Sequence, residues 1–385
     1  LFPYNFIIKS LLLLSYFSVM ETFRFPICQK EISMKTRHEE LPFSPAHPLC
    51  DELFTDNSIF FDIETTGFSP KHTSLYLIGC IRRKNDLLCM DQFFAEAPEE
   101  EKLILTAFLE LLSRYHTIIT YNGIGFDIPY LKAKCGQYDL TEHFSEYDYI
   151  DIFKSVSTMK HIFRLENYKQ KSIEQFLHIS RNDLYNGGEL IPIYQSYTKT
   201  KDSELLELLL LHNYEDVLGM LDLIPILSYV HLFHGGIAQI LTAKSDTART
   251  YDGSDALEYT ITFQPEYPIP EHISYRLDDI YLSGKENRIS LVIRMYEGSL
   301  KYFYPNYKDY YYLPEEDMAM HKSVAAYVEK DHRRQAKAAD CYTKKEGRFL
   351  PQYNTSFVTP AFRRSYEDKL SYFEYTDDFD KNPQM

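Results

Sequence analysis

The chain of 385 residues is long enough for two domains of ordinary size, and its 44% hydrophobic and 25% charged residues are typical of a soluble globular protein. A net charge of -15 argues against a protein that coats duplex DNA through bulk electrostatics. An acidic centre neutralised by metal, next to a local basic track, would still be compatible with nucleic acid. The six cysteines include no Cys-x-x-Cys pair, which argues against a zinc knuckle or a disulfide framework and predicts reduced thiols in the cytosol.

The amino-terminal region predicts a lead-in to the folded chain. Its apolar stretch at residues 6–19 contains Lys9, and it is too short and too interrupted for a membrane-spanning helix. The stretch resembles a signal peptide only weakly, because it has no small-x-small cleavage site. We expect translation to begin at Met20 or Met34, with residues 1–50 partly untranslated or disordered.

The next part of the chain predicts a mixed sheet with helices on its faces. A short apolar run at residues 59–61 is typical of a buried strand. Further strands are expected at 75–81, 87–94, 117–121 and 149–153, and helices at 99–115 and 128–135. A capping box at Ser172 predicts the start of another helix. A long apolar helix is expected at 203–224, where Pro225 ends or kinks it. This order of elements is typical of an α/β fold.

The last part of the chain predicts a smaller α+β module. Strands are expected at 257–263, 273–282, 289–295 and 300–304, followed by a helix at 315–339. We place the domain boundary near residues 236–252. The expected domains are therefore 51–236, a strand-rich module with one long helix at 253–365, and a tail at 366–385.

Two carboxylates follow the first strand. Asp62 and Glu64 are two residues apart, and the alternation of side chains along a strand places them on the same face. Two anions at the end of a buried strand repel each other unless a divalent cation lies between them, and oxygen ligands suit magnesium or manganese. The alternative is an acidic turn, closed by Thr66 and Gly67, that has no function.

Two later segments could supply more carboxylates. Residues 122–127 contain glycines that allow a tight turn, and Asp127 then lies at a helix start, where it either caps the helix or binds metal. His212 and Asp216 are four residues apart in an apolar helix, so they share a face. A core histidine paired with a carboxylate is the structural alternative for this second segment.

Together the three segments resemble the motifs of the ribonuclease H-like DEDD exonuclease superfamily. Residues 61–67 are similar to its first motif, residues 122–127 to its second and residues 212–216 to its third. Residues 171–174, Arg181 and the pair Gly187-Gly188 are similar to the YprB-type subgroup. The resemblance runs from about residue 58 to residue 227, and it implies a ribonuclease H-like mixed five-stranded sheet flanked by helices.

The resemblance also implies two-metal hydrolysis of phosphodiester bonds, with two Mg²⁺ or Mn²⁺ ions. Asp62 would bridge both ions, Glu64 and Asp216 would complete the first site, and Asp127 would hold the second. His212 would accept a proton from the attacking water, as imidazole can near neutral pH.

The third motif departs from the family pattern in its spacing. Histidine-type motifs usually have four residues between histidine and aspartate and tyrosine-type motifs have three, whereas this chain has a histidine with three. His212 thus occupies the place of the tyrosine. Tyr214 is the rival base, but the helical period points Tyr214 and Glu215 away from the face of Asp216.

These implications predict a metal-dependent 3′–5′ exonuclease that acts on single-stranded nucleic acid or a free end, in the cytoplasm and without a membrane. Thr65, Thr66 and Asn122, which lie next to the motifs, are candidate substrate contacts. The alternative from another class is a non-catalytic nucleic-acid-binding module on the same fold, which would not need four converging carboxylates. A transposase or integrase relative is a weaker alternative.

A basic pattern near the carboxyl end suggests a further substrate contact. Lys330, Arg334 and Lys337 recur at helical spacing, and residues 302–312 are rich in tyrosine. Such residues could contact phosphates and stack on unpaired bases. The alternative is a solvated basic face next to an aromatic core.

Overall fold

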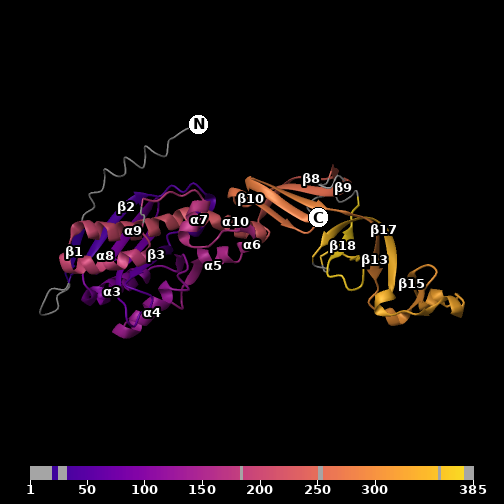
Figure 1. Ribbon diagram of the computed structural model, residues 1–385, viewed down its shortest axis with the longest axis horizontal. Coiled ribbons are helices and arrows are strands. Elements are labelled where there is room, and N and C mark those ends of the chain that lie inside the picture. Colours follow the sequence, from indigo (N-terminus) through magenta and orange to yellow (C-terminus); the bar gives the residue numbers. More distant parts are fainter. Residues whose placement is uncertain (1–19, 25–32, 183–184, 250–254, 354–356, 377–385) are drawn as a thin grey trace. The chain divides into compact units, whose positions relative to one another are not determined.

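The computed structural model describes residues 20–24, 33–182, 185–249, 255–353 and 357–376 (Figure 1). The apolar stretch at residues 6–19 lies outside the described residues. The chain divides into two compact units. Unit 1 comprises Leu1–His234 and Tyr267–Glu271, and unit 2 comprises Gly235–Glu266 and His272–Met385.

Unit 1 contains a seven-stranded mixed sheet in the order β1-β2-β5-β4-β3-β6-β7. The strands are β1 (Met20–Arg24), β2 (Ser33–Pro42), β3 (Ser58–Thr65), β4 (Leu75–Lys84), β5 (Leu87–Phe94), β6 (Thr117–Thr120) and β7 (Asp148–Asp151). The central strand β3 is antiparallel to β4 and parallel to β6. The predicted mixed five-stranded sheet is therefore confirmed, and β2 and β1 extend it beyond β5.

The prediction that residues 1–50 form a loose lead-in is wrong for the described residues among them. Strand β2 pairs with β5 from Lys35 opposite Phe94 to Pro42 opposite Leu87, and helix α2 (Pro48–Leu53) follows it. Among residues 34–42 only Met34 and Arg37 are buried, so the strand needs few apolar residues and its sequence is polar.

Helices cover both faces of this sheet (Figure 1). The larger ones are α3 (Glu101–Leu112), α4 (Asp127–Tyr138), α8 (Gly187–Thr200) and α9 (Ser203–Leu223). One core cluster joins Ile59, Phe61 and Ile63 of β3 to α3 and α4, and another joins β4 to α8 and α9. Because side chains alternate along a strand, the even-numbered residues of β3 face α9.

Helix α9 begins at Ser203, as expected, and Pro225 lies in the turn η2 (Ile224–Ile226) that follows it. With α10 (Leu227–Phe233), the segment Ser203–Phe233 is long and apolar enough to cross a membrane by length and composition alone. Half of its most apolar window is buried inside the structure, and α9 contacts β3, β4 and α8. This is the arrangement of a core helix in a folded domain.

Three short helices connect β7 to α8. They are α5 (Ile152–Ser157), α6 (Lys160–Phe163) and α7 (Gln170–Phe176). The predicted capping box at Ser172 is wrong, because α7 already begins at Gln170 and Lys169 is its N-cap residue. A proper capping box starts α8 instead, where Asn186 and Glu189 bond reciprocally.

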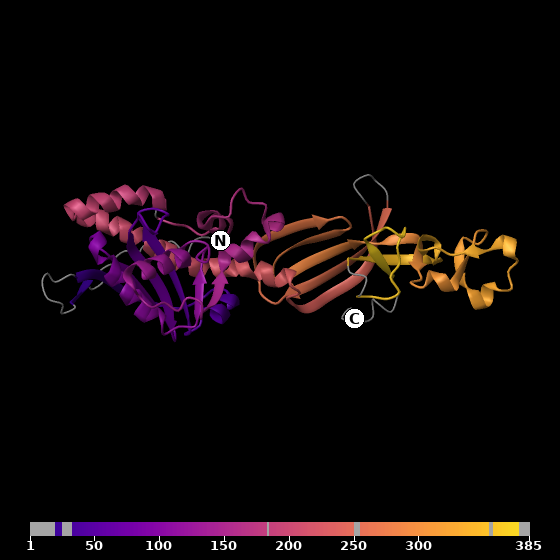
Figure 2. The same ribbon diagram turned by 90° about the horizontal axis from the view of Figure 1, so that it is seen from below.

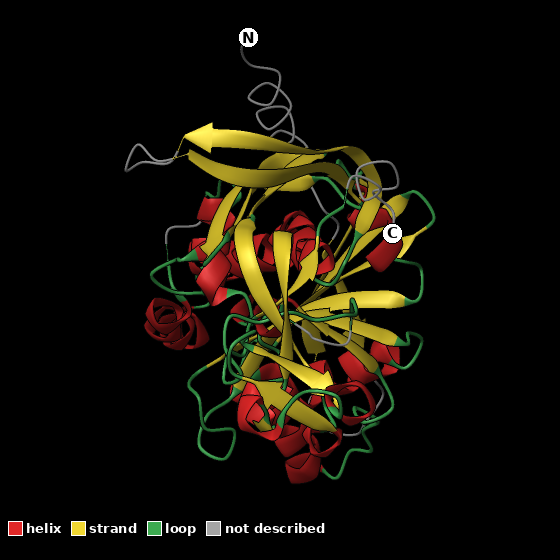
Figure 3. Ribbon diagram, turned by 90° about the vertical axis from the view of Figure 1, so that its right-hand side faces the viewer, coloured by secondary structure: helices red, strands yellow, loops and turns green. Residues whose placement is uncertain are grey.

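Unit 2 is built mainly from strands (Figures 2 and 3). It has a five-stranded sheet in the order β10-β11-β12-β9-β8 and two three-stranded sheets, β13-β17-β18 and β15-β14-β16. The strands are β8 (Ile237–Arg249), β9 (Asp255–Pro265), β10 (Ile269–Leu277), β11 (Ile280–Glu286), β12 (Arg288–Arg294), β13 (Tyr296–Phe303), β14 (Tyr310–Leu313), β15 (Met318–His321), β16 (Arg334–Gln335), β17 (Tyr342–Gln352) and β18 (Ser371–Glu374). The first residues of β10 belong to unit 1.

The long helix expected at residues 315–339 is wrong. The segment contains β15, the four-residue helix α11 (Lys322–Ala325), the turn η4 (Lys330–His332) and β16. Both β15 and β16 pair with β14, and this non-local pairing overrides the helical period of the sequence. Val324 and Tyr327 in this segment are 56% and 92% exposed.

Three other expectations for unit 2 need correction. The expected boundary at residues 236–252 is largely strand β8, whose exposed side chains carry no apolar alternation. The strand expected at 273–282 is divided between β10 and β11 by a turn with a left-handed Asp278. The expected tail at 366–385 contains β18, which pairs with β17, while residues 377–385 lie outside the described residues.

A candidate acidic metal site at the end of the central strand

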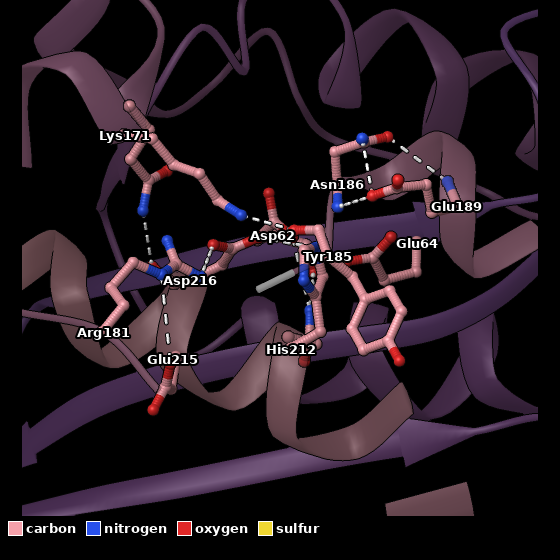
Figure 4. Close-up of polar contacts among 12 residues, drawn as sticks. Asp62, Glu64, Lys171, Arg181, Tyr185, Asn186, Glu189, His212, Glu215 and Asp216 are labelled. Carbon is pink, nitrogen blue, oxygen red and sulfur yellow. Dashed lines mark hydrogen bonds and ion pairs between the residues drawn. The ribbon is translucent and has the colours of Figure 1, made fainter. Parts of the chain in front are cut away.

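Strand β3 brings two carboxylates to the face of α9 (Figure 4). Asn213 of α9 donates from Nδ2 to Asp62 Oδ2 over 3.3 Å, and His212 Nε2 lies 3.4 Å from Glu64 Oε1. The neighbouring Phe61 and Ile63 are buried against α3 and α4 on the opposite face. The register of β3 therefore directs Asp62 and Glu64 to the same side, as the alternation predicted.

Helix α9 contributes a histidine and a third carboxylate. His212 Nε2 lies 3.2 Å from Asp216 Oδ2, one helical turn away. Glu64, His212 and Asp216 each offer a ligand atom, and these atoms all lie within 4.8 Å of one another. The four-residue spacing thus places both α9 residues where β3 delivers its carboxylates.

Asp127 reaches the same neighbourhood from the first turn of α4. Its carboxylate is buried and accepts a backbone hydrogen bond from Ile63 of β3. Burial raises the pKa of Asp127 to about 7. Burial also raises the pKa of Asp62 well above its usual value, and the negative charges of Asp127, Glu64 and Asp216 add to this effect.

The raised pKa values of Asp62 and Asp127 indicate that the positive charge near these carboxylates is too small to balance their negative charge. A divalent cation would relieve both the repulsion and the loss of hydration. The donors are carboxylate oxygens with one imidazole nitrogen beside them, a set that suits Mg²⁺ or Mn²⁺. The residues present therefore fit the metal that the sequence predicts.

Asp151 is a supporting residue that the sequence analysis missed. It is buried at the start of α5, and its carboxylate accepts the backbone N–H groups of Asn122 at 3.0 Å and Ile124 at 3.2 Å. Asn122 needs this support because its φ of 63° is left-handed. Asp151 thus shapes the turn that leads into α4 and Asp127. An aspartate between a strand and a helix is a typical N-cap, which was the available signal.

The threonines expected to contact substrate shape the turn after β3. Thr65 Oγ1 donates to the carbonyl of Gly67 over 2.9 Å, and Thr66 Oγ1 accepts the backbone N–H of Ser74 over 2.8 Å. Both hydroxyls already have a partner in the turn. Phe68, which follows Gly67, is 89% exposed and meets the ring of Phe126 edge-on.

The basic residues expected to contact substrate belong to unit 2. Lys330 lies in η4, Arg334 in β16, and Lys337 is the N-cap residue of η5 (Ala338–Asp340). The three do not share a helix face, so the spacing argument for them is wrong. Arg334 pairs with Asp340 and lies 4.4 Å from the ring centroid of Tyr312.

A second buried group behind the site also escaped the sequence analysis. Gln92 of β5 donates to Asn213 Oδ1 over 3.0 Å and to the carbonyl of Leu210 over 2.8 Å. Gly79 of β4 makes room for Asn213, because a Cβ atom there would lie 1.9 Å from Asn213 Oδ1. A glycine inside an apolar strand was the available signal of such a close approach. The network orients the amide that binds Asp62.

Tyr76 adds a neutral phenol next to Glu64. The side chain is fully buried and stacks on Tyr194 with ring centroids 4.1 Å apart. Burial, and then the charge of Glu64, raise the pKa of Tyr76 well above its usual value. Tyr76 therefore stays protonated and adds no further negative charge to the site.

Known proteins with similar sequence cover the part of the chain that builds this site. A family model described as the RNase_H superfamily matches residues 59–228. The Bacillus subtilis (strain 168) protein named "Uncharacterized protein YprB" is 24% identical over 265 residues, which are 66% of this chain and 62% of that protein. The chain thus spans less than two thirds of the length of this relative.

Two solved structures show weaker similarity. The family B DNA polymerase from the hyperthermophilic archaeon Pyrobaculum calidifontis is 16% identical with a TM-score of 0.36, covering 44% of this chain and 25% of that chain. E. coli exonuclease I in complex with a dT13 oligonucleotide is 10% identical with a TM-score of 0.29, and the match covers 54% of this chain and 55% of that chain. Both scores are too low to carry an argument. The chain is thus similar to the RNase_H superfamily over residues 59–228 and to the YprB protein over 265 residues.

Proposed function

We propose that unit 1 is a metal-dependent nuclease that hydrolyses phosphodiester bonds, and that it is a 3′–5′ exonuclease of the DEDD type. The observation that carries this proposal is the gathering of Asp62, Glu64 and Asp216 with the neighbouring Asp127. They come from three elements that are far apart in the sequence. A binding module would have no use for this costly concentration of negative charge.

Asp62, Glu64, Asp127 and Asp216 would hold two divalent ions. When bound, Mg²⁺ or Mn²⁺ lowers the pKa of water and neutralises charge that develops on the phosphate. The protein supplies the orientation of these carboxylates. Asn213 restrains Asp62, and the backbone of Ile63 restrains Asp127.

His212 is the proposed general base. Its Nε2 atom faces Glu64 and Asp216 from a site that is nearly closed to solvent, so a proton from the attacking water would be taken up at that atom. Tyr214 is buried and is the alternative base that tyrosine-type relatives would suggest.

The exposed rim of the site supports a single-stranded substrate or a free end. Phe68 is 89% exposed and Ile124 is 38% exposed; Phe68 follows β3, and Ile124 lies in the turn before α4, the two elements that carry Asp62, Glu64 and Asp127. Exposed aromatic rings offer stacking surfaces for unpaired bases. Asn122 is also exposed and remains a candidate contact. We place the protein in the cytoplasm because all five cysteines in the described part of the chain are free and buried.

The test is degradation of end-labelled single-stranded and duplex DNA and RNA by the full chain, with Mg²⁺ or Mn²⁺. Labels at the 5′ and 3′ ends separate the two directions of digestion, and a circular substrate separates exonuclease from endonuclease activity. Asp62→Asn should abolish cleavage without unfolding the protein. Asp51→Asn is the matched control, because Asp51 is an exposed carboxylate that pairs with Arg83.

Two results would contradict the proposal. One is undiminished cleavage by Asp62→Asn in excess EDTA. The other is a folded, metal-binding protein that binds nucleic acid but cleaves none of the substrates, which would support the binding-module alternative.

A further inference from the structure

Arg181, in the connection between α7 and α8, lies beside Asp216 and Glu215 at the edge of the acidic site (Figure 4). Its Nη1 atom lies 3.0 Å from Glu174 Oε1, and its Nη2 atom pairs with Asp216 Oδ1. The arginine side chain is only 10% exposed. Its Nε atom also lies 3.9 Å from Glu215 Oε2. A largely buried guanidinium with three carboxylate partners makes strong and directional contacts.

Glu174 of α7 anchors Arg181. Its side chain is 2% exposed, and both of its oxygens accept hydrogen bonds from Arg181. Burial raises the pKa of Glu174, and the charge of Arg181 opposes that rise. Gln170 reinforces the contact by donating to Glu174 Oε1 and to the carbonyl of Asp216. Helix α7 is therefore attached to α9 at the residue that would hold metal.

The backbone next to Arg181 is also attached to α9. Asn182 donates its backbone N–H to both oxygens of Glu215, at 3.2 and 3.0 Å, and its Nδ2 group donates over 2.9 Å. Glu215 Oε2 also lies 3.9 Å from Nε of Arg181, so Glu215 contacts both Arg181 and Asn182. The position of Arg181 therefore depends on α7 and α9 rather than on Asp216 alone.

The two oxygens of Asp216 have different partners as a result. Oδ1 pairs with Arg181, while Oδ2 lies 3.2 Å from His212 Nε2 on the side of Glu64. Rotation of this carboxylate would break the bond to Arg181, which Glu174 holds in place. The contact thus holds the plane of the carboxylate so that its second oxygen faces the acidic site.

We propose that Arg181 is a positioning residue that orients Asp216 so that Oδ2 is available to a divalent ion. The inference rests on the proposed function, because it assigns Asp216 to the metal site. Removing an outer hydrogen-bond partner of a metal ligand typically costs roughly 10- to 100-fold in metal affinity. An arginine that merely competed with the ion would have the opposite effect, since its removal would tighten binding.

The experiment measures Mn²⁺ binding to the full chain by calorimetry and by electron paramagnetic resonance of free Mn²⁺, without nucleic acid. Arg181→Met should bind Mn²⁺ about 10- to 100-fold more weakly. Arg181→Lys should recover part of the loss, because lysine keeps the charge but cannot bridge both carboxylates with one planar group. Arg83→Met is the matched control, since it removes a 19% exposed arginine that pairs with Asp51, outside the acidic site, and it should bind Mn²⁺ normally.

Folding is checked by circular dichroism, and a second variant covers the case in which Arg181→Met does not fold. Glu174→Gln keeps the volume of Glu174 but weakens the anchor of Arg181, and it should lower Mn²⁺ affinity several-fold. Wild-type or tighter Mn²⁺ binding by folded Arg181→Met overturns the inference. If Arg181→Met does not fold, wild-type binding by Glu174→Gln overturns it.

The same measurements separate this inference from the proposed function. A wild-type chain that binds no Mn²⁺ overturns the inference together with the metal-dependent mechanism. A chain that binds Mn²⁺, loses affinity in Arg181→Met and yet cleaves no nucleic acid leaves the inference standing and overturns only the nuclease proposal.

Discussion

The pKa of Asp317 in unit 2 is shifted in the opposite direction from the pKa values of Asp62 and Asp127 in unit 1. In unit 2, Asp317 accepts hydrogen bonds from Tyr312, Tyr342 and Lys344, and these contacts lower its pKa below the usual value. In unit 1, burial is the largest cause that raises the pKa values of Asp62 and Asp127. The protein thus satisfies the charge of one aspartate and leaves the charges of the others unbalanced.

The difference separates a carboxylate satisfied within the fold from the carboxylates of the proposed site. Hydrogen-bond donors on neighbouring strands surround Asp317, so it needs nothing from outside the chain. The carboxylates around Asp62 are brought together against their own repulsion, which a bound cation would offset. A buried group of like charges is therefore better evidence for a site than the number of acidic residues in a sequence.

The largest effect that would sharpen this comparison is expected at His212. His212→Ala should lose about 10²- to 10⁴-fold in turnover while retaining metal affinity, because a general base typically contributes that much. Tyr214→Phe, which removes only a hydroxyl, should lose little. Single-turnover cleavage and Mn²⁺ titration of both variants check this. A crippled Tyr214→Phe with an active His212→Ala would assign the base to the tyrosine.

The next largest effect is expected for the close packing behind Asp62. Gly79→Ala places a Cβ atom 1.9 Å from Asn213 Oδ1, so the side chain that restrains Asp62 must move. Such overpacking typically costs about 1–3 kcal/mol of stability. Gly136→Ala is the control, because nothing lies within 4 Å of a Cβ atom there. A helix position of this kind should gain up to about 1 kcal/mol. Thermal unfolding of both variants tests this prediction. Equal melting temperatures for the two variants would contradict the close approach of β4 to Asn213 at Gly79.

Because the two pKa values are shifted in opposite directions, neutralising Asp127 and neutralising Asp317 should change the stability of the metal-free protein in opposite directions. Because the folded pKa of Asp127 is raised to about 7, the folded state binds more protons than the unfolded state between about pH 4 and pH 7. Stability without metal should therefore fall as the pH rises through that window. Asp127→Asn should remove part of this slope and stabilise unit 1 in EDTA.

Asp317→Asn should instead destabilise unit 2 at neutral pH, by at most about 1 kcal/mol, because the contact is largely exposed. Since the pKa of Asp317 is lowered, its contribution is present at neutral pH and is lost as the pH falls. Denaturant unfolding in EDTA at several pH values tests both variants. A destabilising Asp127→Asn under these conditions would break the comparison.

The smallest effect is expected for the basic residues of unit 2. Changing Lys330, Arg334 and Lys337 together to Gln should weaken nucleic-acid binding only a few-fold, because the three lie on different elements and Arg334 already pairs with Asp340. Binding at several salt concentrations measures the result. A larger loss with a salt slope lower by about 2 would show that all three contact phosphates.

The sequence alone determined the features of unit 1 that depend on local periodicity. The alternation along β3 predicted that Asp62 and Glu64 share a face, and the four-residue spacing in α9 predicted the same for His212 and Asp216. Both relations are set by the geometry of one element, so they can be derived without knowing what packs against it. The order of strands and helices likewise predicted the mixed sheet.

Only the tertiary structure decided which distant residues support the site. Nothing local connects Gly79 and Gln92 to Asn213, or Glu174 to Arg181 and Asp216, because these contacts depend on how β4, β5 and α7 pack against α9.

The same reason explains the errors in unit 2. Residues 315–339 have a helical period, but pairing with β14 draws parts of the segment into strands, and β8 is held by β9 without an apolar pattern of its own. Strand formation depends on partners elsewhere in the chain, whereas a helix satisfies its own backbone hydrogen bonds. The sequence could therefore predict the helix and central strand that carry the candidate site, and it could not predict the strand pairing that builds unit 2.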